Sequence, residues 1–377
     1  MPDSNVTVTA QFKKAKAYPV TISKTENVTV KIDKAEACTG ETVTLSFEFA
    51  QGYDIDTLTV KDSSGKALTV TAGKTFVMPK GGASVSVTVQ QFDSKNFVYV
   101  PGATVKSISG SKVFTGKTFE IKDLYVCKHE TTQAEWEKYM TYYGVASIGS
   151  GAGQSNDPNP YCPIARNGKG PDFPAYALNW FEAVIYCNLR SIDEGFEPVY
   201  YMGNMEKNPA QWEKLANSFV RHNSAGKYYI NDTTDGSVLA KVKMDDKANG
   251  YRLPTEAEWE YLARGGKDKI SGRGTRYSGS DNYNAVGWCG RVASNGKAHE
   301  VMQKSPNNLG IYDMSGNVAE WTWNDIHRGG SWSSVVKSDT NIAEDCTVYG
   351  RPAENKTALG ERRVIAMAGL RVVRTKF

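Results

Sequence analysis

The sequence lacks the features that mark several large classes of protein. It has no uninterrupted apolar run of about 18 residues, so no membrane-spanning helix is expected. Neither sign of charge dominates, because 45 Lys and Arg residues are matched by 41 Asp and Glu residues, for a net charge of +4. That balance differs from the dense positive charge of dedicated nucleic-acid-binding proteins, and no nucleic-acid partner is expected. The 40% of hydrophobic residues argues against a chain that is disordered throughout.

Clustered metal ligands are missing as well. The four histidines are far apart, and the six cysteines form no CxxC motif and no Cys/His cluster, which argues against a zinc site. Buried free thiols and one or two disulfides both fit such scattered cysteines. The glycine-rich segment 149–153 follows no predicted strand and opens no predicted helix, so it does not indicate a phosphate-binding loop. The cysteines are Cys38, Cys127, Cys162, Cys187, Cys289 and Cys346.

Glycine, tyrosine and tryptophan are abundant instead. Their counts are 35, 20 and 8, a composition typical of turn-rich chains with aromatic cores or aromatic binding surfaces. The length of 377 residues predicts two or three domains.

The first part of the chain predicts a small all-β module over residues 14–95. β-Branched residues alternate with polar ones in several runs, and glycines separate these runs as turns. The module resembles the β-repeats of bacterial cell-surface proteins, and this resemblance implies a spacer. The runs lie at 28–32, 42–47, 58–60 and 85–89.

Residues 1–13 repeat the end of this module. Met78-Pro79 and a short polar spacer precede the alternating run 85–92, and Met1-Pro2 with a similar spacer precedes the run 6–12. We therefore expect residues 1–13 to be the last strand of a truncated upstream repeat, or a linker. The natural protein would then continue upstream, with an export signal and a lipid anchor at the cell surface or outer membrane.

Helical patterns begin after about Phe97. Start signals open three of them, at Thr132–Glu135, Asn179–Glu182 and Thr255–Glu258. The glutamates of these helices, Glu260 included, are expected to cap helices or face solvent and not to form an acid/base pair. Long loops rich in Gly, Asn and Ser lie at 144–175, 265–310 and 333–363.

Four longer segments carry a more specific signal. They occur in the order Gly250–Tyr261, Asn308–Trp321, Arg328–Trp332 and Gly369–Arg374. Together with the segments 97–102 and 127–132, they resemble the formylglycine-generating enzyme (sulfatase-modifying factor) family. The resemblance covers residues 96–377 and implies an α+β, C-type-lectin-like domain. We expect these motifs to act mainly as scaffold, with the strands at 328–332 and 370–374 paired to each other.

The resemblance breaks down where the oxidases of the family hold a redox-active, copper-binding cysteine pair. The corresponding positions, two residues after Trp332 and five further on, are Ser334 and Asp339. Neither side chain can supply a thiolate for copper or for a redox disulfide, and the single Cys346 nearby cannot make a pair. We therefore predict that the protein is not an enzyme, has no catalytic residues, binds no copper and requires no cofactor.

The family also builds a calcium site around its Asn-Val-x-Glu-Trp stretch. Carried over to this sequence, the ligands would be the side chains of Asp313 and Glu320 and the carbonyl oxygens of Gly316 and Val318. Oxygen ligands suit a hard cation such as Ca²⁺. A structural calcium ion is one expectation, and carboxylates that only hydrogen-bond the turn are the other.

The segment between the last two motifs shows no clear period. Its mixture of Tyr, Arg, Met and Ile suits a contact surface. Its place between two framework motifs resembles the variable region of proteins that diversity-generating retroelements diversify, which implies a hypervariable ligand-binding face over about residues 325–370. The candidate variable positions are Asp325, His327, Ser333, Ser334, Val336, Thr347, Tyr349, Gly350, Arg363, Ile365 and Met367.

These observations predict a non-enzymatic, surface-displayed bacterial binding protein whose partner is a protein or glycan on another cell. Three alternatives stay open: a fixed-specificity adhesin, a lectin that binds carbohydrate through calcium and, least favoured, an oxidase of the parent family. A C-terminal segment that is identical across isolates would favour the adhesin.

Overall fold

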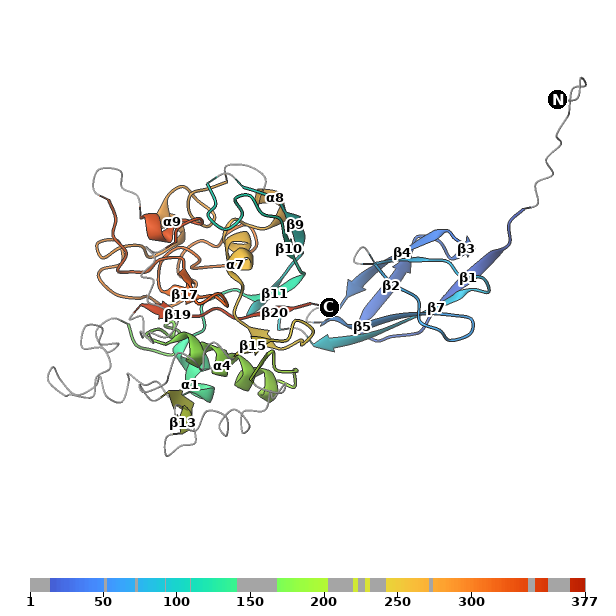
Figure 1. The fold of residues 1–377 in the computed structure, drawn as a ribbon, viewed down its shortest axis with the longest axis horizontal. Helices are drawn as coiled ribbons and strands as arrows, with labels where there is room; N and C mark the ends of the chain where they lie inside the picture. The colour runs from blue at the N-terminus through green and yellow to red at the C-terminus, as the bar shows by residue number, and fades with distance from the viewer. Residues whose placement is uncertain are drawn as a thin grey trace, which may run out of the picture. The chain divides into compact units, whose positions relative to one another are not determined.

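The computed structural model divides the chain into two compact units, Met1–Lys95 and Asn96–Phe377 (Figure 1). The expected terminal strand at 1–13 lies outside the described residues. The structure describes residues 14–50, 53–71, 74–91, 93–108, 110–140, 168–202, 220–222, 228–230, 242–270, 274–337, 343–351 and 367–376.

Two β-sheets form the first unit. One has the strand order β3-β1-β7-β5 and the other has the order β2-β4-β6. Neighbouring strands are antiparallel except β1 and β7, which run parallel. The strands are β1 Ala17–Ile22, β2 Val28–Ile32, β3 Glu36–Cys38, β4 Thr42–Phe49, β5 Tyr53–Asp62, β6 Thr75–Val77 and β7 Ala83–Gln91.

The alternation seen in the sequence decides which side chains enter the core of this unit. In β4, Val43 and Leu45 are buried while Thr44 between them is exposed, because successive side chains of a strand point to opposite faces. The two buried residues pack with Val60 of β5 and Val85 of β7 in one apolar cluster. The four runs predicted as strands all lie in strands, so this part of the prediction is confirmed.

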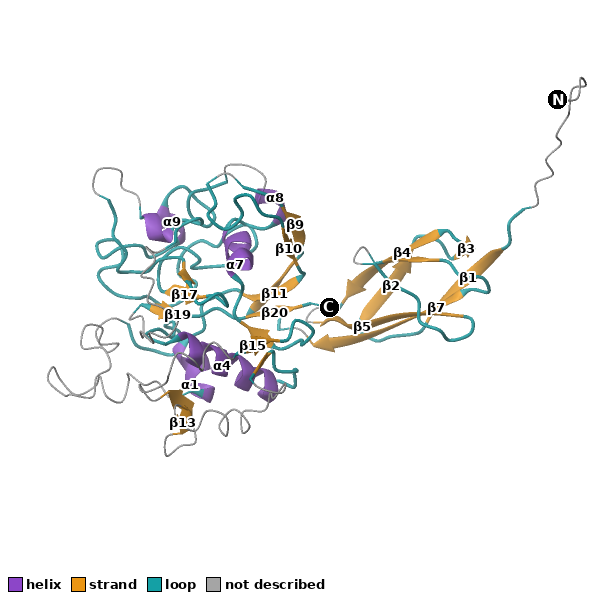
Figure 2. Ribbon diagram, viewed as in Figure 1, coloured by secondary structure: helices purple, strands orange, loops and turns teal. Residues whose placement is uncertain are grey.

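The second unit is an α+β fold in which short strands and helices are joined by long loops (Figure 2). Across the described residues, no helix is both long and apolar enough to cross a membrane. The strands are β8 Phe97–Val100, β9 Ala103–Val105, β10 Phe119–Ile121, β11 Leu124–Cys127, β12 Tyr200–Tyr201, β13 Val220–His222, β14 Tyr228–Ile230, β15 Lys243–Met244, β16 Tyr251–Arg252, β17 Ala319–Trp321, β18 His327–Arg328, β19 Ala368–Gly369 and β20 Val373–Thr375. The helices are α1 Gln133–Tyr139, α4 Trp180–Asp193, α7 Glu256–Ala263, α8 Lys267–Ile270, α9 Tyr283–Val286 and the 3₁₀ helix η1 Glu344–Cys346.

A four-stranded sheet with the order β16-β20-β11-β8 organises this unit. The late strand β20 lies between β11 and β16 and is antiparallel to both. All four residues of β11 are buried, because α7 lies on one side of β11 and β20 while α1 and α4 lie on the other (Figure 1). Trp259 and Leu262 of α7 belong to the same core cluster as Leu124 and Val126 of β11.

Three helices begin at the positions that the sequence predicts. Thr132, Asn179 and Thr255 each accept a hydrogen bond from the backbone N–H of the glutamate three residues later. That glutamate in turn accepts one from the N–H of the cap residue, so two otherwise unpaired donors are satisfied at each helix start. The three predicted helix starts are confirmed.

The expected pairing of strands 328–332 and 370–374 is wrong. Arg328 in β18 pairs with Glu320 in β17, and β17 pairs on its other side, in parallel, with β19. The residues after β19 leave this small sheet and enter the larger one as β20. The two segments therefore meet through β17 and not directly.

Candidate ligand-binding surface

The first two candidate variable residues lie in the turn between β17 and β18. Asp325 is exposed and adopts a positive φ of 57°, and its backbone N–H donates to the carbonyl of Thr322 at 3.2 Å. His327 is half-buried, and its ring lies edge-on to Trp321 with the ring centroids 5.7 Å apart. Burial lowers the pKa of His327 to about 4, so this ring is neutral at pH 7.

The next group of candidates meets a loop from elsewhere in the chain. Ser333, Ser334 and Val336 are partly exposed, and Nε of Arg291 donates to Oγ of Ser333 at 3.4 Å. A Cβ atom at Gly290 would lie 2.5 Å from Cγ2 of Val336. The loop at 290–292 and the segment 333–336 therefore lie side by side.

Two exposed apolar side chains extend from this junction. Val335 is 76% exposed and Val292 is 98% exposed. Isolated apolar residues on a surface are ordinary, but two on adjoining loops form the start of a contact patch. We call residues 291–292 and 333–335 the Val292/Val335 patch. Val292 was not among the sequence candidates, since no motif or period distinguishes it.

The candidates after η1 divide between surface and interior. Tyr349 is 38% exposed, whereas Thr347 is buried and its hydroxyl donates to the carbonyl of Glu344 at 2.7 Å. Gly350 is also buried, and a Cβ atom there would lie 2.3 Å from the same carbonyl oxygen. Burial places Thr347 and Gly350 in the frame below Tyr349, which corrects their expected position on the binding face.

Three candidates remain. Met367 is partly buried, and its carbonyl accepts the N–H of Ala319 at 2.8 Å. Arg363 and Ile365 lie outside the described residues, as does Asp339. The structure thus brings Ser333, Ser334 and Val336 together and leaves the turn at 325–327 as a separate group.

A buried charge network supports the segments that carry these candidates. Arg328 donates to Glu256 at 2.8 Å and to Glu260 at 3.1 Å, and Arg264 donates to Glu260 at 2.8 Å. Arg351, one residue after Gly350, also pairs with Glu256 at 3.0 Å. Glu260 is completely buried, so its expected place on a solvated helix face is wrong. The i, i+4 spacing of the two glutamates on α7 was the signal that sequence reasoning passed over.

A cavity of about 560 Å³ opens beside this network. One wall comes from the segment 112–122, with Phe119 as its aromatic member, and another from the start of α7. Asn324, just before the candidate variable segment, and Arg351, within it, also line the cavity.

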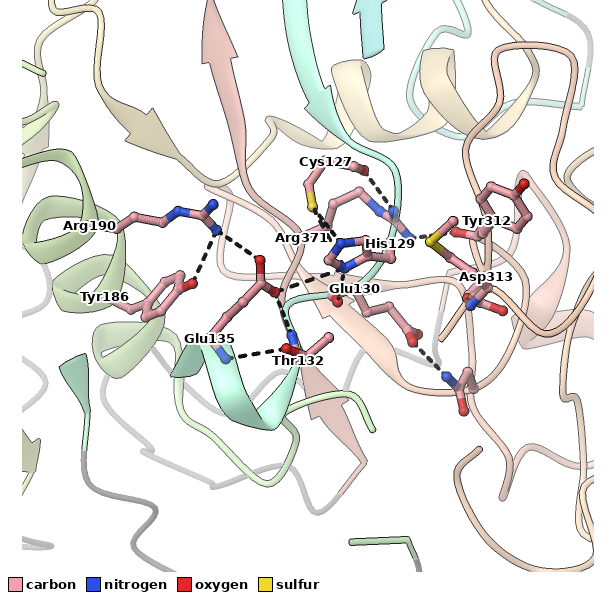
Figure 3. A network of polar contacts seen from close by, with 12 residues as sticks. Cys127, His129, Glu130, Thr132, Glu135, Tyr186, Arg190, Tyr312, Asp313 and Arg371 are labelled. Atoms are coloured by element: carbon pink, nitrogen blue, oxygen red, sulfur yellow. Dashed lines mark hydrogen bonds and ion pairs between the residues drawn. The ribbon is translucent and has the colours of Figure 1, made fainter. Parts of the chain in front are cut away.

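Buried acids also gather near Arg371, where Figure 3 shows Glu130 and Asp313. Glu130 accepts the backbone N–H of Val318 at 3.0 Å and the side-chain amide of Asn317 at 2.7 Å. Burial raises the pKa of Glu130 well above its usual range, and the nearby carboxylates of Asp313 and Glu320 raise it further. Sequence reasoning missed Glu130, although it lies inside the family-like segment 127–132.

The geometry of Glu320 limits its use as a calcium ligand. Oε1 accepts from Nη2 and Nε of Arg371 at 2.6 and 3.1 Å, and Oε2 accepts from Nε of Arg371 and from the indole N–H of Trp259 at 3.2 and 2.7 Å. Three donor groups, with Nε of Arg371 shared between the two oxygens, occupy lone-pair positions of the carboxylate. Glu320 would have to leave Arg371 in order to bind an ion.

Asp313 fits a cation better. Its Oδ2 accepts the N–H of Met302 at 2.7 Å, while Oδ1 is buried and has no hydrogen-bond partner. Burial raises the pKa of Asp313 to about 6. Within the described residues, no three His, Cys, Asp or Glu side chains are grouped to hold a metal ion. The calcium site at Asp313, Gly316, Val318 and Glu320 stays a prediction.

A buried thiol and imidazole lie next to this cluster. The Sγ atom of Cys127 is 3.8 Å from Nδ1 of His129, and that Nδ1 donates to the carbonyl of Glu130 at 2.9 Å (Figure 3). Burial acts to lower the pKa of His129, but Cys127, Glu135 and the Glu130 carbonyl together raise it to about 9. Cys127 has no exposed surface.

Comparison with known proteins gives matches over most of the second unit. The model of the sulfatase-modifying factor enzyme 1-like domain matches residues 83–376. The chain is 30% identical over 311 residues to the chaperone protein LppX of Paenibacillus barcinonensis, and the match covers 75% of this chain and 90% of LppX. It is 36% identical over 110 residues to the inactive C-alpha-formylglycine-generating enzyme 2 of Mus musculus, covering 24% of this chain and 35% of that protein.

A formylglycine-generating enzyme and a solved structure are also similar. The enzyme of Streptomyces coelicolor is 42% identical over 85 residues, which cover 19% of this chain and 26% of the enzyme. Treponema denticola variable protein 1 superimposes with a TM-score of 0.49 at 23% identity, over 74% of this chain and 95% of that chain.

Proposed function

Because the chain belongs to the sulfatase-modifying factor enzyme 1-like domain family but has serine and aspartate in place of the oxidase cysteine pair, we propose that it is a non-enzymatic binding protein. Its binding face would comprise the Val292/Val335 patch and the exposed Tyr349. The ligand would be a protein or glycan on another cell, and the first unit would act as a spacer at the cell surface.

The environment of Ser334 supports the proposed absence of oxidase activity. Its hydroxyl oxygen accepts the backbone N–H of Ser331 at 2.9 Å, so the residue that replaces the first cysteine closes a turn. One relative in the family bears the name of an inactive enzyme, which is consistent with a fold that persists without oxidase activity. No copper and no catalytic residue are needed in this proposal.

The observation that carries the proposal is the contrast between the buried, ion-paired residues of the fold and the exposed apolar side chains of the proposed binding face. Arg328 and Glu260 are fully buried and ion-paired, whereas Val335 and Val292 are exposed. A rigid frame lowers the entropy that must be lost when loops bind, so exposed apolar side chains on it contribute efficiently to affinity. Changes in these side chains would alter specificity without altering the fold, as diversification by a retroelement requires.

Binding can be tested on intact cells with the fluorescently labelled protein and its variants. If a cell type or a glycan array gives saturable binding, Val335→Asp and Val292→Asp should each weaken it about tenfold or more, since a charge would have to be desolvated in the contact. Val77→Asp is the matched control, because Val77 is 60% exposed in the first unit. Equal loss in all three variants, or none in the patch variants, would reject this face.

Diversification is tested by sequencing the gene from several isolates and from a growing population. We expect substitutions at the codons for Ser333, Val336 and Tyr349, arising at adenines of a nearby template copy. A uniform segment without such a copy would leave a fixed-specificity adhesin as the better account.

A separate test for the oxidase uses a cysteine-containing sulfatase peptide with copper and dioxygen, and we expect no change in the mass of the peptide.

A second candidate function comes from the relative that matches over 90% of its length. That relative is called a chaperone, and chaperones bind other proteins. If this chain is one, an equimolar amount should suppress the aggregation of a heat-denatured client protein, and Val335→Asp should reduce the effect. Unchanged light scattering at several molar ratios would remove this candidate.

A further inference from the structure

Two cysteines that lie 57 positions apart in the sequence meet inside the second unit. Cys289 and Cys346 are free thiols with no exposed surface. Both belong to one small apolar cluster, together with Tyr277, Tyr283 and Val286. Burial raises the pKa of the Cys289 thiol well above its usual range, and the neighbouring Cys346 raises it further. The folded chain therefore provides Cys346 with the second sulfur that its sequence neighbourhood lacks.

The surrounding backbone fixes this arrangement. Sγ of Cys346 lies 4.0 Å from the carbonyl oxygen of Ser331, and that oxygen also accepts the N–H of Gly290, the residue after Cys289. Sγ of Cys289 donates to the carbonyl of Ser315 at 3.4 Å. Ser331 thus links the backbones on both sides of the sulfur pair.

Two glycines leave the space that the sulfurs occupy. A Cβ atom at Gly330 would lie 2.6 Å from Sγ of Cys346, and one at Gly316 would lie 2.8 Å from Sγ of Cys289. The two glycines have positive φ values of 66° and 94°, a conformation that side chains other than glycine rarely adopt. Backbone and space both restrict these positions to glycine, and each of them faces one member of the sulfur pair.

We propose that Cys289 and Cys346 form a disulfide bond when the protein folds in an oxidising environment. A low-molecular-weight disulfide such as oxidised glutathione is the oxidant. The first thiolate attacks it, forms a mixed disulfide and releases one glutathione thiolate. The second thiolate then attacks the protein sulfur and releases the second glutathione. The two cysteines lose two electrons and two protons, and one glutathione disulfide becomes two thiols.

The bond would connect two parts of the candidate binding face. Cys346 ends η1, which leads to Tyr349, and Cys289 precedes the loop that carries Val292. A cross-link at this depth would hold both loops on the frame while leaving their exposed side chains free to differ. The inference does not depend on the proposed ligand, because the bond can be detected in the isolated protein.

The decisive measurement is mass spectrometry of the full chain refolded with oxidised glutathione and digested without reduction. We expect a peptide pair that joins Cys289 to Cys346 and that separates on reduction. Both sulfurs are buried, so protein that is purified reduced and kept folded should form the bond much more slowly than refolding protein. Alkylation of both thiols after oxidative refolding, or a bond from either cysteine to a different one, would overturn the proposal.

A second measurement follows the melting temperature with and without dithiothreitol. Closing a loop of this length should raise the Tm of the oxidised protein by about 5–10 °C. Cys289→Ala and Cys346→Ala should each abolish the dithiothreitol-dependent shift, while Cys38→Ala, in the first unit, should retain it. A shift that survives in both single variants would assign the effect to other cysteines. The peptide map uses the unmodified chain, so it tests for the Cys289–Cys346 bond even if a substitution prevents folding.

Discussion

The guanidinium group of Arg371 lies against the carboxylate of Glu320, with Nη2 and Oε1 2.6 Å apart and both side chains removed from solvent. Arg371 also donates to the backbone carbonyls of Cys127 and Tyr312. One side chain from the segment before β20 therefore connects β17, β11 and the turn that holds Asp313. Its positive charge is also the counterpart of the acids gathered there.

Removing the guanidinium group of Arg371 should strongly lower the stability of the folded protein. Arg371→Met leaves Glu320 buried without its counter-charge, and we expect the free energy of unfolding to fall by about 3–5 kcal/mol. Urea denaturation followed by tryptophan fluorescence would measure the change. The double variant Glu320→Gln/Arg371→Met should lose less than the sum of the single variants. Arg351→Met is the control, because that arginine is partly exposed, and its loss should cost about 1 kcal/mol.

His327 predicts a stability that depends on acidic pH. Its folded pKa of about 4 lies below the ordinary value of 6.5, so between these values the unfolded chain binds more protons. Stability should therefore decrease by about 1–3 kcal/mol as the pH falls from 6.5 to 4. His327→Gln should make the pH profile flatter in this window. An unchanged profile would show that the imidazole is solvated in the folded protein.

Asp313 predicts a stability that decreases as the pH rises, which is opposite to the effect of His327, over an overlapping pH range. Its pKa of about 6 lies above the ordinary value of 3.8, so the folded state holds the proton longer than the unfolded state. The protonated carboxyl group of Asp313 therefore contributes its full share to the free energy of unfolding below pH 4, and this share is lost as the pH rises to 6. Asp313→Asn should therefore increase stability at pH 7 by about 1–3 kcal/mol. Equal stability of the two proteins at pH 7 would contradict the desolvation of this carboxylate.

The predicted calcium site gives a separate readout of the same residue. Calcium bound to the folded state alone should raise the melting temperature of the wild-type protein at pH 7 and should have no effect on Asp313→Asn. Magnesium is the matched control ion, since it prefers tighter octahedral geometry. The site is rejected if calcium shifts neither protein or shifts both equally.

The stability of the protein should respond differently to substitution at the buried Gly350 and at the partly exposed Tyr349. Gly350→Ala places a methyl group 2.3 Å from a backbone oxygen of Glu344, and we expect it to cost about 1–3 kcal/mol. Tyr349→Ala, one residue away, should change stability by no more than about 0.5 kcal/mol. Thermal melts of the two variants would test this order. Comparable losses would mean that Tyr349 belongs to the frame.

Local signals predicted the regular elements well. The alternation in 42–47 and the capping boxes at Thr132 and Thr255 are properties of a few neighbouring residues, and the structure contains the corresponding strand and helices. Family-like motifs also indicated the fold of the second unit. Strand pairing was harder, because β17 lies between β18 and β19 and nothing within the segment 328–332 specifies that order.

The site was less predictable because it depends on contacts between distant segments. The loop that carries Val292 lies beside the segment 333–336 only through the fold, and Cys289 shares a cluster with Cys346 for the same reason. Glu260 and Glu130 look like ordinary charged residues until their partners, Arg328 and Asn317, are known. Position in the sequence identified the loop at 333–336, whereas burial alone distinguished Tyr349 from Gly350.

The location of β20 also has a genetic consequence. This strand is encoded after the candidate variable segment, yet it lies between β11 and β16 in a four-stranded sheet. A deletion or insertion that shifts the reading frame anywhere in codons 325–370 would replace β20 with unrelated residues and leave β11 without its neighbour. Only substitutions and in-frame changes would then yield a folded protein. The sheet would therefore exclude frameshifted products from the pool of folded protein.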